Sequence, residues 1–346
     1  MINTLIVDDS ALVRSIIRDF LESDGSFNII GEAIDGEEGI QKILSLNPDL
    51  VTLDIEMPKM NGFEVIEAVM KKTSVPIVVI TSQDTAKTAY EATLKGALEF
   101  YSKDIFSASL NPLKRNEIYE TLKRISRINI QENVNVFSEL SIYSKEITEI
   151  KTINKRNIQA VVIASSTGGP KALSIFFSLI PKDFPVPIVV VQHNSSGFDK
   201  SFAQWLDTYT SLNVKVANEG EIFKAGTVYI AQTDRHLVLQ GGNGQNCYAH
   251  YNDDPAENNQ KPAADVLFRS AAENLKEAVI SIVLTGMGSD GASGTRKIKE
   301  MGGITFAQDE DSSLIYGMPR VAFETGCVDI VLPLTSIPAE LCKLVG

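Results

Sequence analysis

Short apolar runs that each end in a polar residue recur along this chain, and they limit its fold more than any other feature. Residues 5–7 end at Asp8, and residues 160–164 lead to Ser165 and Ser166. Further runs of this kind cover residues 50–53, 77–80, 186–191 and 278–284. Strands buried on both faces have this uninterrupted pattern, which is typical of parallel sheets covered by helices. The sequence therefore predicts an α/β fold in which strands and helices alternate.

The chain is long enough to bury two hydrophobic cores, because it has 346 residues, of which 44% are hydrophobic. Residues 1–122 alternate strands and helices in five units, and β-rich runs interleaved with helices begin again near residue 158. The segment between them is polar and weakly periodic. We expect two doubly wound domains, residues 1–122 and a mostly parallel second domain over residues 158–346, joined by a linker over residues 123–157.

Composition argues against several classes of protein. A net charge of -12 makes a nucleic-acid partner unexpected, because such binding depends on positive charge. No apolar run approaches the roughly 20 residues of a membrane span, and the N-terminus enters a strand without a signal-peptide pattern. The three cysteines lack CxxC spacing, so neither a disulfide framework nor a zinc site is expected. We therefore expect a cytoplasmic protein without membrane insertion.

One strand runs into a turn of serine, threonine and glycine that opens a helix. The turn covers residues 165–169 and places a hydroxyl at the carboxyl end of the strand. Backbone N–H groups at a helix start can receive a developing negative charge. This geometry suits a nucleophilic serine. The same turn could also cap the helix or hold a phosphate.

A nucleophilic serine needs a base, and the chain has three histidines. His193 ends a buried strand, as Ser166 does. His236 stands between two β-rich runs and His250 in a polar segment, so both are interpreted as turn or surface residues. Asp290 lies in a glycine-rich loop after the strand over residues 278–284, where it could cap a helix or orient an imidazole. Ser166, His193 and Asp290 together at one sheet edge would match the place where open α/β sheets bind ligands.

Carboxylates end two strands in the first third of the chain. Asp8 and Asp9 follow one strand and Asp54 follows another. Converging carboxylates make an oxygen site that suits Mg²⁺. Thr81 and Lys103 end two further strands, so a carboxylate, a hydroxyl and an ammonium group are expected together. This combination describes a site for an acyl phosphate, although Thr81 could cap a helix and Lys103 could be an ordinary solvated lysine.

Motifs in both halves of the chain carry a resemblance to a known family. In the first half these are residues 7–12 and 53–62, and in the second half residues 165–169, 192–193, 262–268, 284–292 and 316–320. At these motifs the chain resembles chemotaxis response-regulator protein-glutamate methylesterases/glutaminases. The resemblance covers nearly the whole chain except the linker. It implies a flavodoxin-like receiver domain followed by an esterase domain.

The resemblance also implies roles for individual residues. Asp54 corresponds to the phosphoacceptor, and Asp8 and Asp9 join it as Mg²⁺ ligands. The phosphate-sensing positions are Thr81, Tyr101 and Lys103. The catalytic triad falls on Ser166, His193 and Asp290, and the oxyanion donors on the backbone N–H groups of Thr167 and Met287. No cofactor is implied for the esterase step.

The implied activity is demethylation of glutamate methyl esters, and deamidation of glutamines, on methyl-accepting chemotaxis receptors. A chemotaxis histidine kinase is the implied phosphodonor, and phosphorylation is expected to activate the hydrolase. The alternative is a phosphorylation-controlled binding module with a decayed esterase domain. A nucleotide-binding loop at residues 165–169 is a further alternative, although the turn lacks the GxGxxG and P-loop spacings.

The sequence departs from the resembling family beside two of these residues. Ala164 and Ser165 stand where glycine and alanine are usual before the nucleophile, and Asn194 and Ser195 stand where methionine and proline usually follow the histidine. The resemblance therefore does not predict which receptor glutamates this chain prefers.

Overall fold

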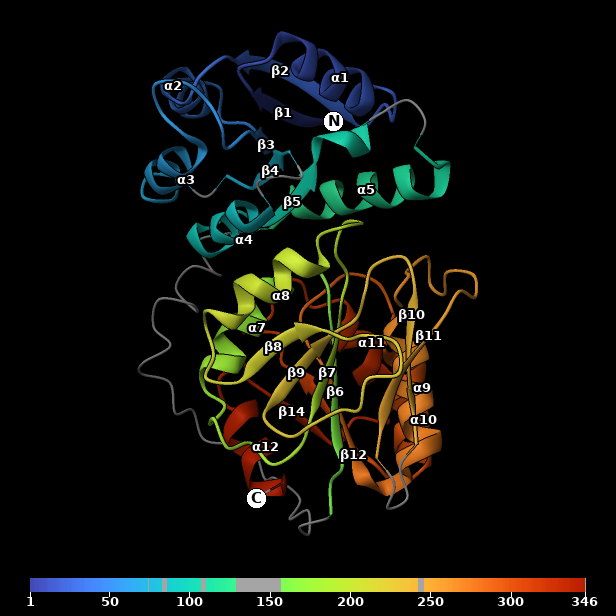
Figure 1. Cartoon of the computed structure of the whole chain (residues 1–346). Coiled ribbons are helices and arrows are strands. Elements are labelled where there is room, and N and C mark those ends of the chain that lie inside the picture. The colour runs from blue at the N-terminus through green and yellow to red at the C-terminus, as the bar shows by residue number, and fades with distance from the viewer. Residues whose placement is uncertain (74, 83–85, 107–109, 129–156, 242–245, 346) are drawn as a thin grey trace. The chain divides into compact units, whose positions relative to one another are not determined.

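The computed structural model describes residues 1–73, 75–82, 86–106, 110–128, 157–241 and 246–345 (Figure 1). The chain divides into two compact units, residues 1–135 and 136–346. Each unit is described by itself. The larger part of the expected linker, residues 129–156, lies outside the described residues, and a helix that starts at Pro112 continues to Ile125.

The N-terminal unit contains a five-stranded parallel sheet with the order β2-β1-β3-β4-β5. Its strands are β1 (Ile2–Val7), β2 (Phe27–Ala33), β3 (Leu50–Leu53), β4 (Ile77–Thr81) and β5 (Glu99–Ser102). In the register of the sheet, Val7 of β1 pairs with Leu53 of β3. Asp8 and Asp54 are the next residues on these strands, so both come to the same edge of the sheet.

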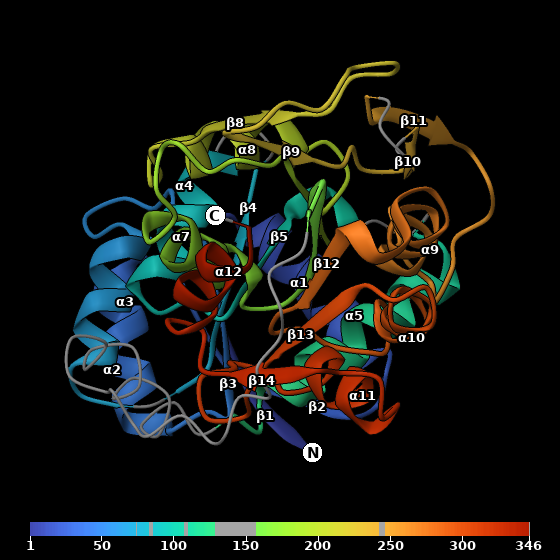
Figure 2. The same ribbon diagram turned by 90° about the horizontal axis from the view of Figure 1, so that it is seen from below.

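Helices cover both faces of this sheet. They are α1 (Ala11–Glu22), α2 (Gly36–Leu46), α3 (Gly62–Met70), α4 (Ala86–Lys95) and α5 (Pro112–Ile125), with a 3-10 turn η2 (Lys103–Phe106) after β5. Helices α1 and α5 lie together, since the rings of Phe20 and Tyr119 are 4.8 Å apart. Helix α3 contacts α2 and α4 on the other face (Figures 1 and 2).

The C-terminal unit contains a seven-stranded parallel sheet with the order β14-β13-β12-β6-β7-β9-β8. Its strands are β6 (Ala160–Ser165), β7 (Ile188–Gln192), β8 (Asn213–Val216), β9 (Thr227–Ile230), β12 (Val279–Val283), β13 (Ile304–Gln308) and β14 (Ile330–Leu332). A separate antiparallel pair is formed by β10 (His236–Gln240) and β11 (Tyr248–Asn252).

Two groups of helices cover this second sheet. They are α7 (Gly169–Ser178), α8 (Asp199–Asp207), α9 (Ala264–Leu275), α10 (Ala292–Glu300), α11 (Met318–Glu324) and α12 (Ile337–Val345), with a 3-10 turn η3 (Lys276–Ala278) before β12. Helix α7 contacts α8 and α12, whereas α10 contacts α9 and α11 (Figure 2). The expected α/β architecture is therefore present in both units.

The central strands of the second sheet explain where a site can form. β6, β7 and β12 are buried along their whole length, as their uninterrupted apolar sequences predict. The chain passes from β6 to β7 on one side and later returns as β12 on the other side of β6. The connections therefore diverge at β6, and the carboxyl ends of the strands at such a point are where open α/β sheets bind ligands.

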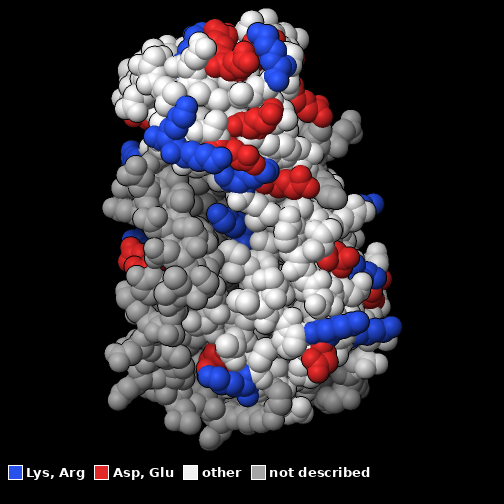
Figure 3. All heavy atoms as spheres, turned by 90° about the vertical axis from the view of Figure 1, so that its left-hand side faces the viewer, with Lys and Arg blue, Asp and Glu red and all other residues white. Residues whose placement is uncertain are grey.

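Charged residues of both signs are interspersed among the described residues on the face drawn in Figure 3. Within the described part of the chain, none of the helices is long and apolar enough to cross a lipid bilayer.

Candidate functional site

Ser166 lies in a tight turn between β6 and α7. Its backbone N–H donates to the carbonyl oxygen of Thr285 at 3.1 Å, and its own carbonyl oxygen accepts from the N–H of Gly169 at 2.7 Å. Gly168 has a φ of +78°, a left-handed conformation that glycine adopts without a Cβ penalty. The turn holds Ser166 at the carboxyl end of β6 and at the start of α7, where the sequence predicts it.

The loop after β12 approaches Ser166 closely. A Cβ atom added to Gly286 would lie 2.7 Å from the Cβ of Ser166 and 2.5 Å from the Sδ of Met318. The N–H of Met318 donates to the carbonyl oxygen of Gly286 at 2.8 Å. The side chains of Ser166 and Met318 fill the space around position 286, so a residue larger than glycine would clash there. Thr167 and Met287 directly follow Ser166 and Gly286 at this edge of the sheet.

His193 and Asp290 form a direct hydrogen bond. His193 follows β7 and Asp290 precedes α10, and the distance from Nε2 of His193 to Oδ2 of Asp290 is 2.8 Å. The histidine side chain is 8% exposed and the aspartate side chain is 2% exposed. The structure thus brings together two of the three residues that the sequence proposes as a triad, and places Ser166 on the neighbouring strand end.

The carboxylate of Asp290 is held in its ionised form. Burial alone would raise its pKa, but the hydrogen bond to His193 and those from the backbone keep the pKa below its usual value. The backbone donors are Ala264 at 2.6 Å, Asp265 at 2.9 Å and Gly291 at 3.0 Å. A charged and fixed carboxylate can orient the imidazole and stabilise its protonated form.

The second nitrogen of His193, Nδ1, is buried and has no hydrogen-bond partner among the described residues. Because Nε2 is engaged with Asp290, Nδ1 is the nitrogen available for proton transfer. The described hydrogen bonds do not include one between Nδ1 and the hydroxyl of Ser166. Catalytic hydrogen bonds often tighten only when substrate is present.

The structure adds a second buried carboxylate, Asp265, to which the sequence interpretation gave no role. Its Oδ1 accepts from the N–H of Gly294 at 2.6 Å, and its Oδ2 accepts from Nδ2 of Asn258 at 2.9 Å. Burial and the negative charge of Asp290 raise the pKa of Asp265 to about 6. The available signal was an aspartate in the first turn of the helix that begins at Ala264.

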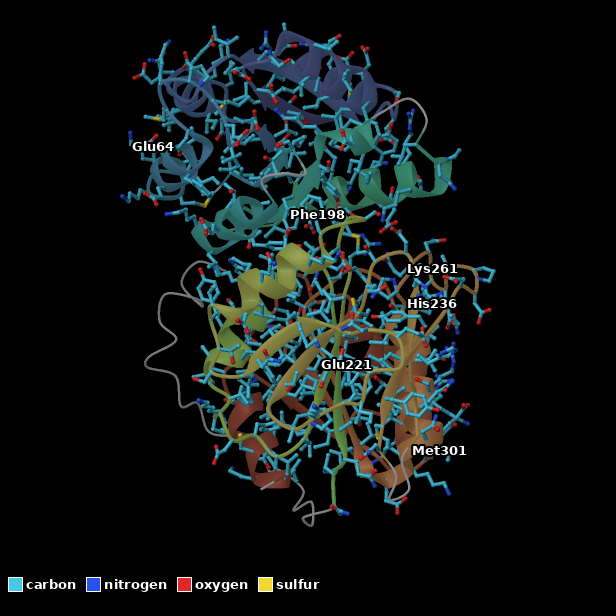
Figure 4. The ribbon with its side chains drawn as sticks, in the orientation of Figure 1. Glu64, Phe198, Glu221, His236, Lys261 and Met301 are labelled. Carbon is cyan, nitrogen blue, oxygen red and sulfur yellow. The ribbon has the colours of Figure 1, made fainter. Side chains whose placement is uncertain are left out.

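Two sequence interpretations of the other histidines are wrong. His236 is not a surface turn residue; it begins β10 and is 0% exposed. Its Nδ1 accepts from the N–H of Ala263 at 3.1 Å, and its Nε2 donates to the carbonyl oxygen of Pro255 at 3.0 Å. It lies close to the segment around Lys261, which precedes α9 (Figure 4). His250, whose side chain is 43% exposed, lies in β11 rather than in a loop.

The N-terminal unit brings its three predicted carboxylates together. One oxygen each from Asp8, Asp9 and Asp54 lies within 4.8 Å of the others. Nζ of Lys103 is 2.7 Å from Oδ2 of Asp54 and 2.9 Å from Oδ2 of Asp8. Lys103 stands at the start of η2, directly after β5, so three strand ends, those of β1, β3 and β5, supply this cluster.

The electrostatics of this cluster favour a bound cation. Burial raises the pKa of Asp54, and Lys103 only partly opposes that rise. Asp8 and Asp54 are buried, whereas Asp9 is exposed. The ammonium group of Lys103 contacts two of the three carboxylates, those of Asp8 and Asp54, and carboxylate oxygens are the ligands that Mg²⁺ prefers. The residues therefore fit a Mg²⁺ ion that retains some of its water.

The remaining predicted residues of the N-terminal site lie on the neighbouring strands. Thr81 ends β4 and is 0% exposed. Tyr101 lies in β5, where Ile80 is its strand partner. Burial raises the pKa of Tyr101 well above its usual value, and its hydroxyl interacts with Thr121 of α5. The ring of Tyr101 also contacts that of Phe106 edge-on, at 6.3 Å.

Comparison with known proteins divides the chain into the same two parts. The family model described as CheB methylesterase matches residues 161–341, and the response regulator receiver domain model matches residues 4–112. A protein-glutamate methylesterase/protein-glutamine glutaminase from Thermotoga maritima is 39% identical over 349 residues, covering 100% of this chain and 99% of the relative. One of the same name from Clostridium acetobutylicum is 40% identical, covering 99% of this chain and 98% of the relative.

A solved structure supports the fold of the second unit. The crystal structure of the Thermotoga maritima CheB methylesterase catalytic domain aligns with a TM-score of 0.53 and 44% identity, covering 55% of this chain and 100% of that one. The predicted resemblance is thus confirmed over both halves of the sequence. The chain belongs to the CheB methylesterase family and carries a response regulator receiver domain ahead of the catalytic domain.

Proposed function

We propose that this protein is a phosphorylation-regulated hydrolase that demethylates glutamate methyl esters, and deamidates glutamines, on the cytoplasmic helices of methyl-accepting chemotaxis receptors. The observation that carries the proposal is the buried His193–Asp290 pair, whose remaining imidazole nitrogen has no partner among the described residues, beside the Ser166 turn. The names of the full-length relatives support the reaction class. The activity belongs in the cytoplasm, where the proposed substrate segments lie.

In the proposed mechanism, the hydroxyl oxygen of Ser166 attacks the γ-carbonyl carbon of the methylated glutamate. Nδ1 of His193 takes the hydroxyl proton, and the ionised carboxylate of Asp290 stabilises the resulting imidazolium through Nε2. Collapse of the tetrahedral intermediate breaks the bond to the methoxy oxygen. His193 returns its proton to that oxygen, so methanol leaves and an acyl-serine remains.

Water completes the cycle. His193 removes a proton from a water molecule as the oxygen attacks the acyl carbon, and then protonates the oxygen of Ser166 as it leaves. The products are a glutamate and free Ser166. Glutamine follows the same course with ammonia as the leaving group. The nucleophile, the base and the charge come from side chains, so the proposed esterase step uses no cofactor.

The negative oxygen of the tetrahedral intermediate needs donors at the same sheet edge. We assign this role to the backbone N–H groups of Thr167 and Met287. Thr167 directly follows the nucleophile at the start of α7, and Met287 follows Gly286, whose missing side chain lets the loop approach Ser166. Donors fixed in place before reaction stabilise developing charge without reorganisation.

The receiver domain supplies the regulation in this proposal. Asp54 accepts a phosphoryl group from a chemotaxis histidine kinase, and Asp8, Asp9 and Asp54 would hold Mg²⁺. When bound, this ion would offset the negative charge of the phosphoryl group. Lys103 already pairs with Asp54, and Thr81 and Tyr101 lie on adjacent strands where they can respond to the modification.

The test measures methanol release from membranes that carry methylated chemoreceptors, with wild type and Ser166→Ala, each with and without acetyl phosphate and Mg²⁺. We expect release from wild type that rises with the phosphodonor, and a loss of about 1,000-fold or more in Ser166→Ala. Release that survives Ser166→Ala would contradict the proposed nucleophile. An inactive wild type that still binds the receptor when phosphorylated would favour a binding module instead.

A further inference from the structure

One buried carboxamide bridges the backbones of the proposed nucleophile and base. Gln192 ends β7, pairs in register with Ser165, and is 3% exposed. Its Nε2 donates to the carbonyl oxygen of Ser166 at 3.0 Å and to that of His193 at 2.9 Å. Both hydrogens of the amide are thereby used, and each reaches a residue of the proposed site.

The oxygen of the same amide has its own partner. The hydroxyl of Ser165, which is 0% exposed, donates to Oε1 of Gln192 at 2.7 Å. This network also fixes the orientation of the amide, because a flipped amide would place Oε1 against two carbonyl oxygens that cannot donate. A buried amide with its donors and acceptor satisfied is rigid and costly to disturb.

The close approach of this amide also explains a glycine in the turn. A Cβ atom added to Gly169 would lie 1.9 Å from Oε1 of Gln192. Gly169 is also the residue whose N–H donates to the carbonyl oxygen of Ser166. That carbonyl oxygen therefore accepts from the turn on one side and from Gln192 on the other, which fixes the peptide that follows Ser166.

We propose that Gln192, held by the Ser165 hydroxyl, is a positioning residue that sets the distance and orientation between Ser166 and His193. This inference rests on the proposed function, because it assigns a purpose to the spacing of those two residues. Gln192 does not touch the reacting atoms. It acts through the two carbonyl groups that it joins across β6 and β7, which are linked at this edge by one further bond from the N–H of His193 to the carbonyl oxygen of Ser165.

Loss of the Gln192 amide should change the rate of the chemical step more than the binding of substrate. A displacement of about 1 Å between nucleophile and base can cost about 100-fold in rate. The Gln192 amide is buried and its hydrogen bonds go to Ser165, Ser166 and His193, so we expect it to make no contact with substrate. Removing the amide should therefore lower kcat and leave KM nearly unchanged. It should also slow the reaction of Ser166 with a small electrophile that needs no receptor binding.

The experiment uses the full chain with Gln192→Met, Ser165→Ala, the double variant and Ser166→Ala. Methionine keeps the length of glutamine but has no amide. Asn274→Leu is the matched control, because Nδ2 of Asn274 also donates to two carbonyl oxygens, those of Leu239 and Ser270, at 3.1 and 2.9 Å. That carboxamide lies in α9 and joins no residue of the proposed site. Methanol release gives kcat and KM, and inactivation by phenylmethanesulfonyl fluoride gives the reactivity of Ser166.

We expect Gln192→Met to lower kcat about 100-fold with KM within about threefold, and to slow inactivation in parallel. Ser165→Ala should lower kcat about 3- to 10-fold, as the loss of one neutral hydrogen bond implies. In the Gln192→Met background, Ser165→Ala should have no further effect on kcat, because its acceptor is gone. Asn274→Leu should lower the melting temperature while kcat stays within about twofold of wild type.

A Gln192→Met variant with the kcat of wild type would overturn the inference, and so would additive effects in the double variant. Equal losses of kcat in Gln192→Met and Asn274→Leu would also overturn it, since they would indicate general loosening. If Gln192→Met does not fold, Ser165→Ala, which removes only a hydroxyl, decides the question by its kcat and inactivation rate. Methanol release that survives Ser166→Ala would overturn the proposed function as well, which separates the two failures.

Discussion

Two buried aspartates of the C-terminal unit each hold the start of the other's helix. Asp290, which precedes α10, accepts from the N–H groups of Ala264 and Asp265 at the start of α9. Asp265, in the first turn of α9, accepts from the N–H of Gly294 in α10. Carboxylates are stabilised at helix N-termini, so this exchange fixes Asp290 toward His193. The two carboxylates nevertheless repel each other, and their pKa values move in opposite directions.

The raised pKa of Asp265 predicts that the stability of the protein depends on pH. In the folded state the carboxyl group of Asp265 has a pKa of about 6, whereas the usual value is 3.8. Between these values the folded state binds more protons than the unfolded state, so the contribution of Asp265 to stability falls as the pH rises and reaches its minimum above pH 6. Asparagine does not titrate. From pH 4 to 7, the free energy of unfolding of Asp265→Asn should therefore rise by up to about 3 kcal/mol relative to that of wild type.

Calorimetric melting of both full-length proteins at several values across this pH range measures the effect. Comparing the two proteins removes the contributions of the other acids, such as Glu32 and Asp24, whose lowered pKa values act in the opposite direction. Asparagine also changes the hydrogen bonds to Asn258 and Gly294, which gives an offset that does not depend on pH. A difference in melting temperature that stays constant across the range would contradict the prediction.

At the scale of single elements, helix α3 begins with a reciprocal pair of side-chain hydrogen bonds. Oδ1 of Asn61 accepts from the N–H of Glu64 at 3.1 Å, and Oε2 of Glu64 accepts from the N–H of Asn61 at 2.9 Å. Glu64 lies at the N-terminal end of this helix (Figure 4). Gly62, between them, packs so closely that an added Cβ would lie 2.5 Å from the carbonyl oxygen of Asp54. This cap therefore also fixes the backbone of the proposed phosphoacceptor.

Asn61→Ala should cost about 1 kcal/mol of stability in the receiver domain, because the N–H of Glu64 loses its side-chain acceptor. Thermal unfolding of the full chain, followed by calorimetry, should place the receiver transition a few degrees lower. Glu64→Gln is the control, since glutamine can complete the same box, and it should melt close to wild type. An Asn61→Ala protein with an unchanged receiver transition would show that the cap contributes nothing.

The sequence predicted elements well where their pattern was uninterrupted and less well elsewhere. β6, β7 and β12 are buried on both faces, so their apolar runs and their polar ends were visible, and with them Ser166, His193 and Asp290. The hairpin of β10 and β11 mixes buried and half-buried positions, which hid His236 and His250 in apparent turns. Gln192 and Asp265 were missed because their roles depend on partners 26 and 25 residues away, which periodicity does not reveal.

At the scale of the whole molecule, the chain combines two chemistries in two compact units. Asp54, Asp8 and Lys103 form a charged cluster in the first, and Ser166, His193 and Asp290 lie around one sheet edge in the second. Within the described residues, the single group of three side chains suited to a metal ion is Asp8, Asp9 and Asp54. The proposed function therefore makes phosphorylation dependent on Mg²⁺ and ester hydrolysis independent of it, so the two steps can be separated by chelation.

This separation predicts the behaviour of the full chain in the methanol-release assay. Asp54→Asn should keep the basal rate of wild type and lose its stimulation by acetyl phosphate, because an amide cannot accept the phosphoryl group. Asp49→Asn is the matched control: Asp49 precedes β3 and Asp54 follows it, so both variants change one aspartate at an end of the same strand. We expect the control to be stimulated like wild type. EDTA added to wild type should likewise abolish stimulation while leaving the basal rate within about twofold. Stimulation that persists in Asp54→Asn would contradict control through Asp54, and a basal rate lost to EDTA would contradict a metal-free esterase step.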